Sequence, residues 1–148
     1  MRIPAVPLLL GLAGLIPFLW GALTSLNDPL AVWGQQTLGV RFVGPFVQLS
    51  YGVVILSFMS GVLWGFAVRA DKQHAPLCFG LSVVPALWVF FMTGRGMASD
   101  SINLICGFLA VLLIDLAFSR WGLTPPWWMR LRSFLTAVVV ICIGVSAL

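Results

Sequence analysis

The sequence predicts an all-α integral membrane bundle of five transmembrane helices, and three observations support this fold class. Hydrophobic residues make up 61% of the 148 residues, against only 8 Lys or Arg and 4 Asp or Glu. The mean hydropathy is +1.08, so there are too few polar side chains to cover a surface in water. Charged and turn-forming residues divide the chain into five apolar segments, and a helix needs about 20 residues to cross a bilayer. We therefore expect a single membrane domain over residues 1–148, with the lipid bilayer as its solvent.

The first span is expected at about residues 5–26. Pro17 lies inside it and predicts a kink, which a bundle tolerates because neighbouring helices satisfy the freed carbonyl. Directly after this span, Asn27, Asp28 and Pro29 form a helix-start signal. The sequence therefore predicts a short surface helix between the first two spans.

The other four spans follow from the remaining apolar segments. The second is longer than a hydrocarbon core of about 30 Å requires, which implies tilt. The fourth is long enough only if Asp115 lies inside it, and the last starts beside Trp127 and Trp128, which we interpret as anchors at the membrane interface. These spans are expected at about residues 44–68, 75–94, 101–119 and 128–148.

The basic residues predict the orientation of the bundle. Five spans place the termini on opposite sides, and an N-terminus in the cytoplasm puts six basic residues inside and two outside. The inner ones are Arg2, Arg69, Lys72, Arg120, Arg130 and Arg132, and the outer ones are Arg41 and Arg95. Cytoplasmic loops of membrane proteins carry an excess of Lys and Arg, so we expect N-in and C-out. We interpret the basic residues as topological, with no nucleic acid partner, and we place the multi-pass protein in the bacterial inner (plasma) membrane because the sequence lacks an Arg-rich, Ser-rich transit segment.

Asp115 is a carboxylate inside an apolar run, about 7.5 Å along the helix axis before Arg120. An ionised group in the membrane is costly and needs a partner, for which Arg120, Arg130 and Arg132 are the candidates. One interpretation is a proton or cation site. The other is a structural charge pair between helices, which we favour because a single intramembrane carboxylate makes a poor relay.

Small residues recur at four-residue spacing in the second span, at Ser57, Gly61 and Gly65. This spacing predicts a helix-packing face on which another backbone approaches closely. The partner is either another helix of the same chain, which we favour, or another protein. At the outer end of this span, Gln48, Ser50 and Tyr51 either line a small cavity or satisfy one another, and we favour the second interpretation.

Enzymatic signatures are weak, so we expect no catalytic residues, no metal site and no cofactor. His74 is the single histidine and lies in a polar loop. Ser82 follows a glycine, but Val84 stands where a nucleophilic serine motif requires a second glycine, and no membrane histidine exists to act as its base. The cysteines lie singly in apolar runs, which predicts neither disulfides nor metal ligation; they are Cys78, Cys106 and Cys142.

Four segments of the chain together resemble a known family. The main one is YGVVILSFMSGVLWG at residues 51–65, supported by GLIPF at 14–18 and SVVPALW at 82–88. A further match near the end of the chain comprises Pro126, Trp127, Leu131, Arg132, Leu135 and Thr136. These segments resemble a bacterial and mitochondrial membrane family of unknown function that includes transmembrane protein 69. The resemblance implies a small multispan protein of energy-converting membranes without an established activity. It also implies that Asp115 and Arg132 are family positions, without assigning them a role.

The sequence leaves two classes of function open. The first is a non-catalytic accessory or assembly partner of other inner-membrane complexes, respiratory ones included. It would bind other membrane subunits through the small-residue face and the cytoplasmic rim of Trp and Arg side chains. The second is a small-solute or proton-coupled carrier or channel that uses Asp115, as a homo-oligomer because five helices enclose little volume.

Overall fold

Helices make up the regular structure of the chain in the computed structural model, which describes residues 2–148. The helices are α1 (Ala5–Ala13), α2 (Ile16–Leu26), α3 (Asp28–Leu38), the short 3-10 helix η1 (Val40–Phe42), α4 (Gly44–Ala67), α5 (Ala75–Met92), α6 (Met97–Arg120) and α7 (Trp128–Ala147). With α1 and α2 taken together as Ala5–Leu26, five of the described segments are long and apolar enough to cross a membrane. The predicted five-span, all-helical fold is confirmed.

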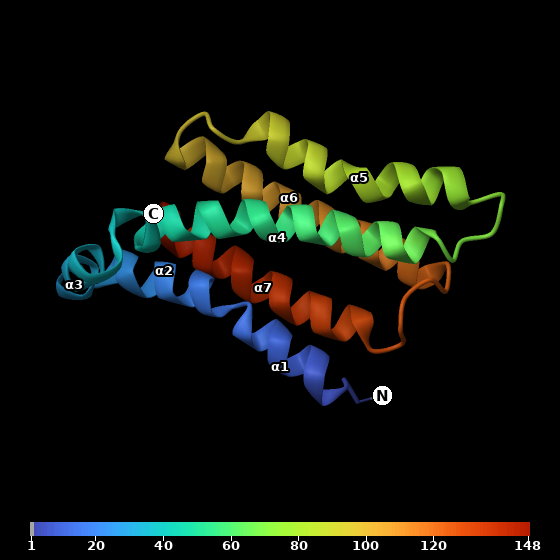
Figure 1. Cartoon of the computed structure of the whole chain (residues 1–148), viewed down its shortest axis with the longest axis horizontal. Helices are drawn as coiled ribbons and strands as arrows, with labels where there is room; N and C mark the ends of the chain where they lie inside the picture. The colour runs from blue at the N-terminus through green and yellow to red at the C-terminus, as the bar shows by residue number, and fades with distance from the viewer. Residues whose placement is uncertain (1) are drawn as a thin grey trace.

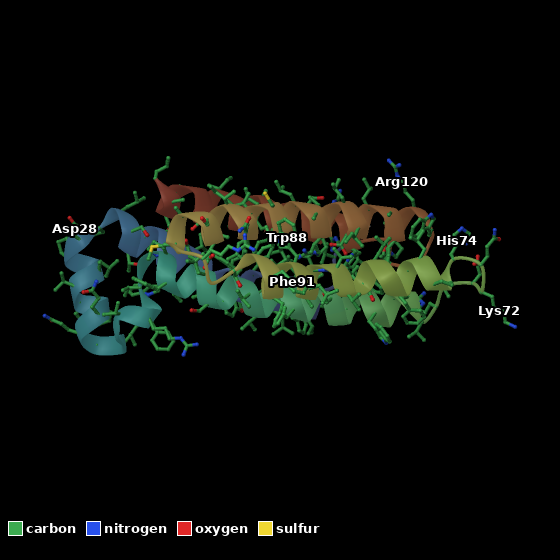
Figure 2. The ribbon with its side chains drawn as sticks, turned by 90° about the horizontal axis from the view of Figure 1, so that it is seen from above. Asp28, Lys72, His74, Trp88, Phe91 and Arg120 are labelled. Carbon is green, nitrogen blue, oxygen red and sulfur yellow. The ribbon has the colours of Figure 1, made fainter. Side chains whose placement is uncertain are left out.

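The spans run side by side along one long axis, with the N- and C-termini at opposite ends (Figure 1). The α4–α5 and α6–α7 connections lie at the end that holds the N-terminus, whereas α3 lies at the other end. Figure 2 shows Lys72, His74 and Arg120 together at the first end and Asp28 at the opposite one. This arrangement is compatible with the charge asymmetry, while the orientation in the bilayer stays a prediction.

The first span is broken between α1 and α2, next to the predicted kink at Pro17. Proline has no N–H, so the carbonyl of Ala13 cannot receive its usual helical bond, and α1 ends at this residue. Helical bonding resumes where the Leu19 N–H donates to the Leu15 carbonyl at 3.0 Å. α1 diverges from α4 beyond the break and lies beside α7 (Figure 1).

The predicted surface helix is α3, and its start is the one the sequence indicates. The Asn27 side chain accepts the Leu30 N–H at 3.0 Å as an N-cap. Another hydrogen bond joins α2 to the start of α4, where the Thr24 hydroxyl accepts the Gly44 N–H at 2.7 Å. Gly44 has a φ of 58°, a left-handed conformation that favours glycine.

The span boundaries differ from the predicted ones at the α5–α6 connection. α5 ends at Met92 rather than residue 94, and α6 begins at Met97 rather than residue 101. The earlier start of α6 is explained by Asp100, which directly precedes the predicted start of the fourth span at residue 101. Its carboxylate lies in the first turn of α6 and accepts the N–H groups of Gly94 and Arg95 at 2.9 and 3.1 Å. An acidic side chain is favourable at that position because it faces the positive end of the helix dipole.

Close approaches between helices hold the centre of the bundle together. A Cβ built on Gly21 of α2 would lie 2.8 Å from the Gly44 carbonyl oxygen, and one on Gly107 of α6 would lie 2.9 Å from Leu56 of α4. Only glycine permits these two approaches without displacement of the neighbour. The surrounding core joins α2, α4, α5, α6 and α7, and its fully buried large side chains include Phe18, Leu56, Leu104, Phe108 and Ile143.

Candidate functional site: a buried ion pair beside a lateral groove

Asp115 of α6 and Arg132 of α7 form a buried ion pair. Arg132 Nε lies 2.9 Å from Asp115 Oδ2, and the indole N–H of Trp128 donates to Asp115 Oδ1 at 2.9 Å. Trp128 and Arg132 are one helical turn apart, so the two donors project from the same face of α7. Asp115 is fully buried and Arg132 is 6% exposed. Both carboxylate oxygens are therefore engaged by α7.

The structure brings Asp115 together with one of the three candidate arginines. Arg120 and Arg130 are exposed at the end of the bundle. The indole N–H of Trp128 is directed to Asp115. The positions of Trp127 and Trp128 relative to the headgroups stay predictions.

Two polar atoms near this pair have no hydrogen-bond partner among the described residues. One is Arg132 Nη2 and the other is the hydroxyl of Thr136, which lies one turn further along α7 and is 2% exposed. Buried donors without partners are unusual in folded proteins, since each costs about 1–3 kcal/mol. Thr136 entered the sequence analysis only through the family resemblance, because an isolated threonine in an apolar run carries no signal of its own.

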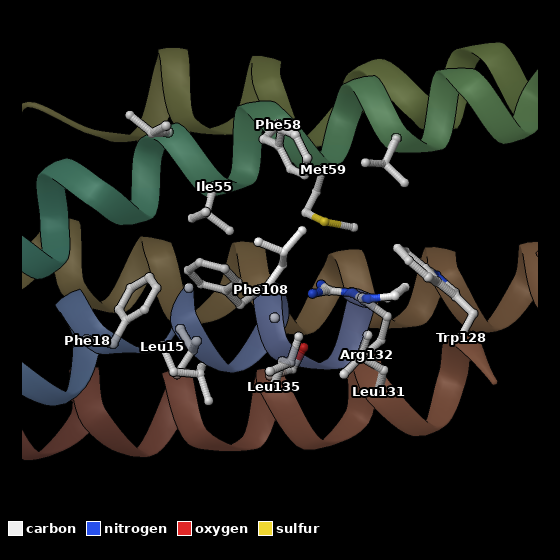
Figure 3. A pocket seen from close by; sticks show the side chains of 18 of the residues that line it. Leu15, Phe18, Ile55, Phe58, Met59, Phe108, Trp128, Leu131, Arg132 and Leu135 are labelled. Atoms are coloured by element: carbon white, nitrogen blue, oxygen red, sulfur yellow. The ribbon is translucent and has the colours of Figure 1, made fainter. Parts of the chain in front are cut away.

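A groove of about 770 Å³ lies beside the ion pair, bounded by α1, α2, α4 and α7, with Phe108 of α6 at its base. Its lining is almost wholly apolar and aromatic, with Arg132 and Thr136 among the polar exceptions. Figure 3 shows the Arg132 side chain extending into the space between Phe108 and Trp128, with Leu135 on the α7 side. Side chains that line the groove are also strongly exposed, which indicates that the groove opens sideways toward lipid; they are Val6, Leu10, Val54 and Phe58.

Gln48 links three spans instead of bonding with its polar neighbours as expected. Its amide nitrogen donates to the carbonyls of Phe18 in α2, at 2.9 Å, and Cys142 in α7, at 3.1 Å. Tyr51 packs edge-on against Phe18, with ring centroids 5.4 Å apart, and lines the groove. Ser50 lies on the exposed side of α4.

The small-residue face of α4 does not pack against another helix of the chain. Ser57, Gly61 and Gly65 are exposed, and a Cβ built on either glycine meets no atom of the described residues within 4 Å. This corrects the expectation of an intramolecular partner. The close contacts of α4 lie on its other side, where a Cβ on Gly52 would approach Leu104 at 2.9 Å. Four-residue spacing alone did not distinguish the two faces.

The remaining candidate positions lie apart from this site. His74 is exposed, with its Nδ1 2.9 Å from Asp71 Oδ1. The His74 backbone N–H, aided by the ring, holds the pKa of Asp71 below its usual value. In residues 2–148, no three His, Cys, Asp or Glu side chains gather as a metal site, and the cysteines are free thiols.

Five apolar spans, with a buried ion pair between α6 and α7, define a multi-pass membrane protein of the all-helical class. The chain belongs to the family described as Protein of unknown function (DUF3429), whose family model matches residues 3–148. It is 36% identical over 141 residues to Transmembrane protein 69 of Xenopus tropicalis, an alignment that covers 93% of this chain and 51% of that protein. The chain thus spans about half the length of this relative. The family resemblance is confirmed, and no solved structure matches the chain.

Proposed function

We propose that this protein is a non-catalytic accessory or assembly partner of other membrane proteins in the bacterial inner membrane, respiratory complexes included. The observation that carries the proposal is the exposed face of Ser57, Gly61 and Gly65 on α4. Helices associate in lipid mainly through close van der Waals packing, which small residues at this spacing promote. Phe58 and Trp64, which are 64% and 50% exposed, flank the face and provide side chains for a partner helix to pack between.

The surroundings of Asp115 support this choice over a carrier or channel. A transport site requires a carboxylate that water or a solute can reach, whereas Asp115 is fully buried and both its oxygens accept hydrogen bonds. The groove beside it is lined almost wholly by apolar groups, which offer no path for a hydrated ion.

The test is photo-crosslinking from the α4 face at native expression. A photoreactive amino acid at Trp64 should give a discrete heterologous adduct in membranes. Gly61→Leu should reduce this adduct, and the co-purification of the same protein in mild detergent, by tenfold or more because the leucine prevents close approach. Gly80→Leu is the matched control, since Gly80 of α5 is also exposed with no atom within 4 Å of an added Cβ.

Three results would contradict the proposal. The first is an adduct at twice the 16.1 kDa chain mass, which would assign the face to a homo-oligomer. The second is an unchanged adduct in Gly61→Leu. The third is proton or ion flux in liposomes that Asp115→Asn abolishes in a folded protein, which would favour the carrier.

A further inference from the structure

We propose that the lateral groove binds an isoprenoid quinone, with the tail between α1 and α4 and one ring carbonyl accepting hydrogen bonds from Arg132 and Thr136. The proposal is independent of the docking face on α4. It rests on the unpartnered polar atoms, the charge of the ion pair, and the shape and lining of the groove.

The unpartnered atoms define what the headgroup must offer. Arg132 Nη2 can only donate a hydrogen bond, and the Thr136 hydroxyl can donate one, so a ligand that satisfies both presents an acceptor oxygen. The two residues are one turn apart on α7 and both line the groove, so a single oxygen can face both. Both atoms are shielded from solvent, and the ligand reaches them as flexible neighbours such as Met59 adjust.

The ion pair favours an uncharged ligand. Asp115 already neutralises Arg132, with Nε and Oδ2 2.9 Å apart. A carboxylate or phosphate in the groove would therefore add an unbalanced charge in a low-dielectric environment, which is costly. A neutral carbonyl accepts the free N–H without this cost.

The depth of the donors and the aromatic lining favour a quinone over a glycerolipid. Thr136 lies eight residues, about 12 Å, along α7 from Trp128. With Trp128 at its predicted interface level, the Thr136 hydroxyl lies deeper than glycerol esters, which stay near the headgroups. A planar quinone ring stacks on aromatic faces, and Phe108 and Trp128 lie on either side of Arg132 in Figure 3. The volume of about 770 Å³ falls within the 300–1,000 Å³ range of small-molecule sites.

The break in the first span creates the groove and its entrance. α1 carries no buried side chain and approaches α7 at Gly11, where an added Cβ would lie 3.1 Å from Leu135. The opposite rim belongs to α4, where Val54 is 59% exposed. A single isoprenoid tail can enter between the two rims directly from the membrane.

The test measures the binding of ubiquinone-2 to the purified protein in phosphatidylcholine nanodiscs. Binding is detected by the quenching of tryptophan fluorescence and by the displacement of tritiated quinone. We expect saturable binding to the wild-type chain. Thr136→Val keeps the shape and removes the hydroxyl, so binding should weaken about two- to tenfold. Val54→Trp should fill the entrance and weaken binding more than tenfold, whereas Leu113→Trp, at a 68% exposed position outside the groove, should leave it unchanged.

The competing occupants are outcomes of the same assay. Displacement of the quinone by an equimolar amount of dioleoylglycerol or oleate would overturn the proposal in favour of an ester or an anionic lipid. So would non-saturable partitioning, or equal affinities for the Val54→Trp and Leu113→Trp variants. Monodisperse elution and a thermal midpoint no lower than that of the wild-type chain for Thr136→Val ensure that a loss of binding is not a loss of fold.

Discussion

Asp115 and Arg132 depend on each other because each is buried. A buried charge that loses its partner destabilises a protein by about 3–5 kcal/mol, whereas replacement of both partners by apolar groups is often neutral. The Trp128 N–H adds a second donor to the same carboxylate at 2.9 Å. The pair therefore fixes how α6 and α7 face each other more than it adds net stability.

This dependence predicts an asymmetric double-mutant cycle. Arg132→Met should lower the free energy of unfolding by about 3–5 kcal/mol because it leaves Asp115 unpaired. The double variant Asp115→Leu/Arg132→Met should recover most of that loss. Reversible unfolding in mixed micelles with increasing dodecyl sulfate measures both values. A double variant as unstable as the single one would show that packing, rather than charge, sets the cost.

The sequence identified Asp115 as a buried charge, but it did not identify which side chains or carbonyls the polar residues of the bundle bond. Asp115 stood out because a carboxylate in an apolar run needs a counter-charge. The choice among Arg120, Arg130 and Arg132 depends on how two helices are rotated about their axes, which hydropathy does not specify. The contacts of Gln48 with two backbone carbonyls escaped prediction for the same reason.

Ser60 of α4 compensates for a proline in the neighbouring element. Pro85 lies inside α5 and disturbs the local helical bonds, and the Ala86 N–H donates to the Ser60 hydroxyl at 2.8 Å instead. Proline in a membrane helix is tolerated where a neighbouring helix supplies such a partner. The bond joins α4 and α5 at the middle of the bundle.

We predict that Ser60→Ala destabilises the protein by about 1 kcal/mol, because it leaves a buried N–H without an acceptor. The loss should shrink in a Pro85→Ala background, where the helix can bond regularly. Ser57→Ala is the control, since that hydroxyl is exposed and bonds only the Val53 carbonyl of its own helix. The same micelle unfolding assay measures all four variants. If Ser60→Ala lowers the free energy of unfolding equally with and without Pro85, the two residues are not coupled and the prediction is wrong.

The elements themselves were largely predictable, because lipid imposes a strict rule on backbone bonding. Five spans and the capped surface helix at Asn27 follow from apolar length and turn chemistry. The face that each helix buries did not follow. Ser57, Gly61 and Gly65 were assigned to the interior by spacing, yet in lipid an apolar exterior resembles an apolar core, so periodicity carries little information about burial.

For the whole molecule, we predict an N-in, C-out orientation. In a cysteine-free background, Gln73→Cys should resist an impermeant maleimide applied to intact cells, and Met97→Cys should react. Both positions are exposed at connections on opposite ends of the bundle and neither carries charge, so the basic residues that set topology stay in place. Detergent permeabilisation is the control and should make both sites reactive. Labelling of Gln73→Cys alone would reverse the orientation, and labelling of both sites in sealed cells would exclude five alternating spans.

Gln48 also constrains the order in which the protein is made. Its two acceptors lie 30 residues earlier and 94 residues later in the chain. When the ribosome has delivered the second span into the bilayer, the Phe18 carbonyl is already available, but Cys142 has not yet been synthesised. The nascent chain must therefore carry the Gln48 amide nitrogen with only one of its two acceptors until the last span inserts, and the final stretch of translation supplies the second.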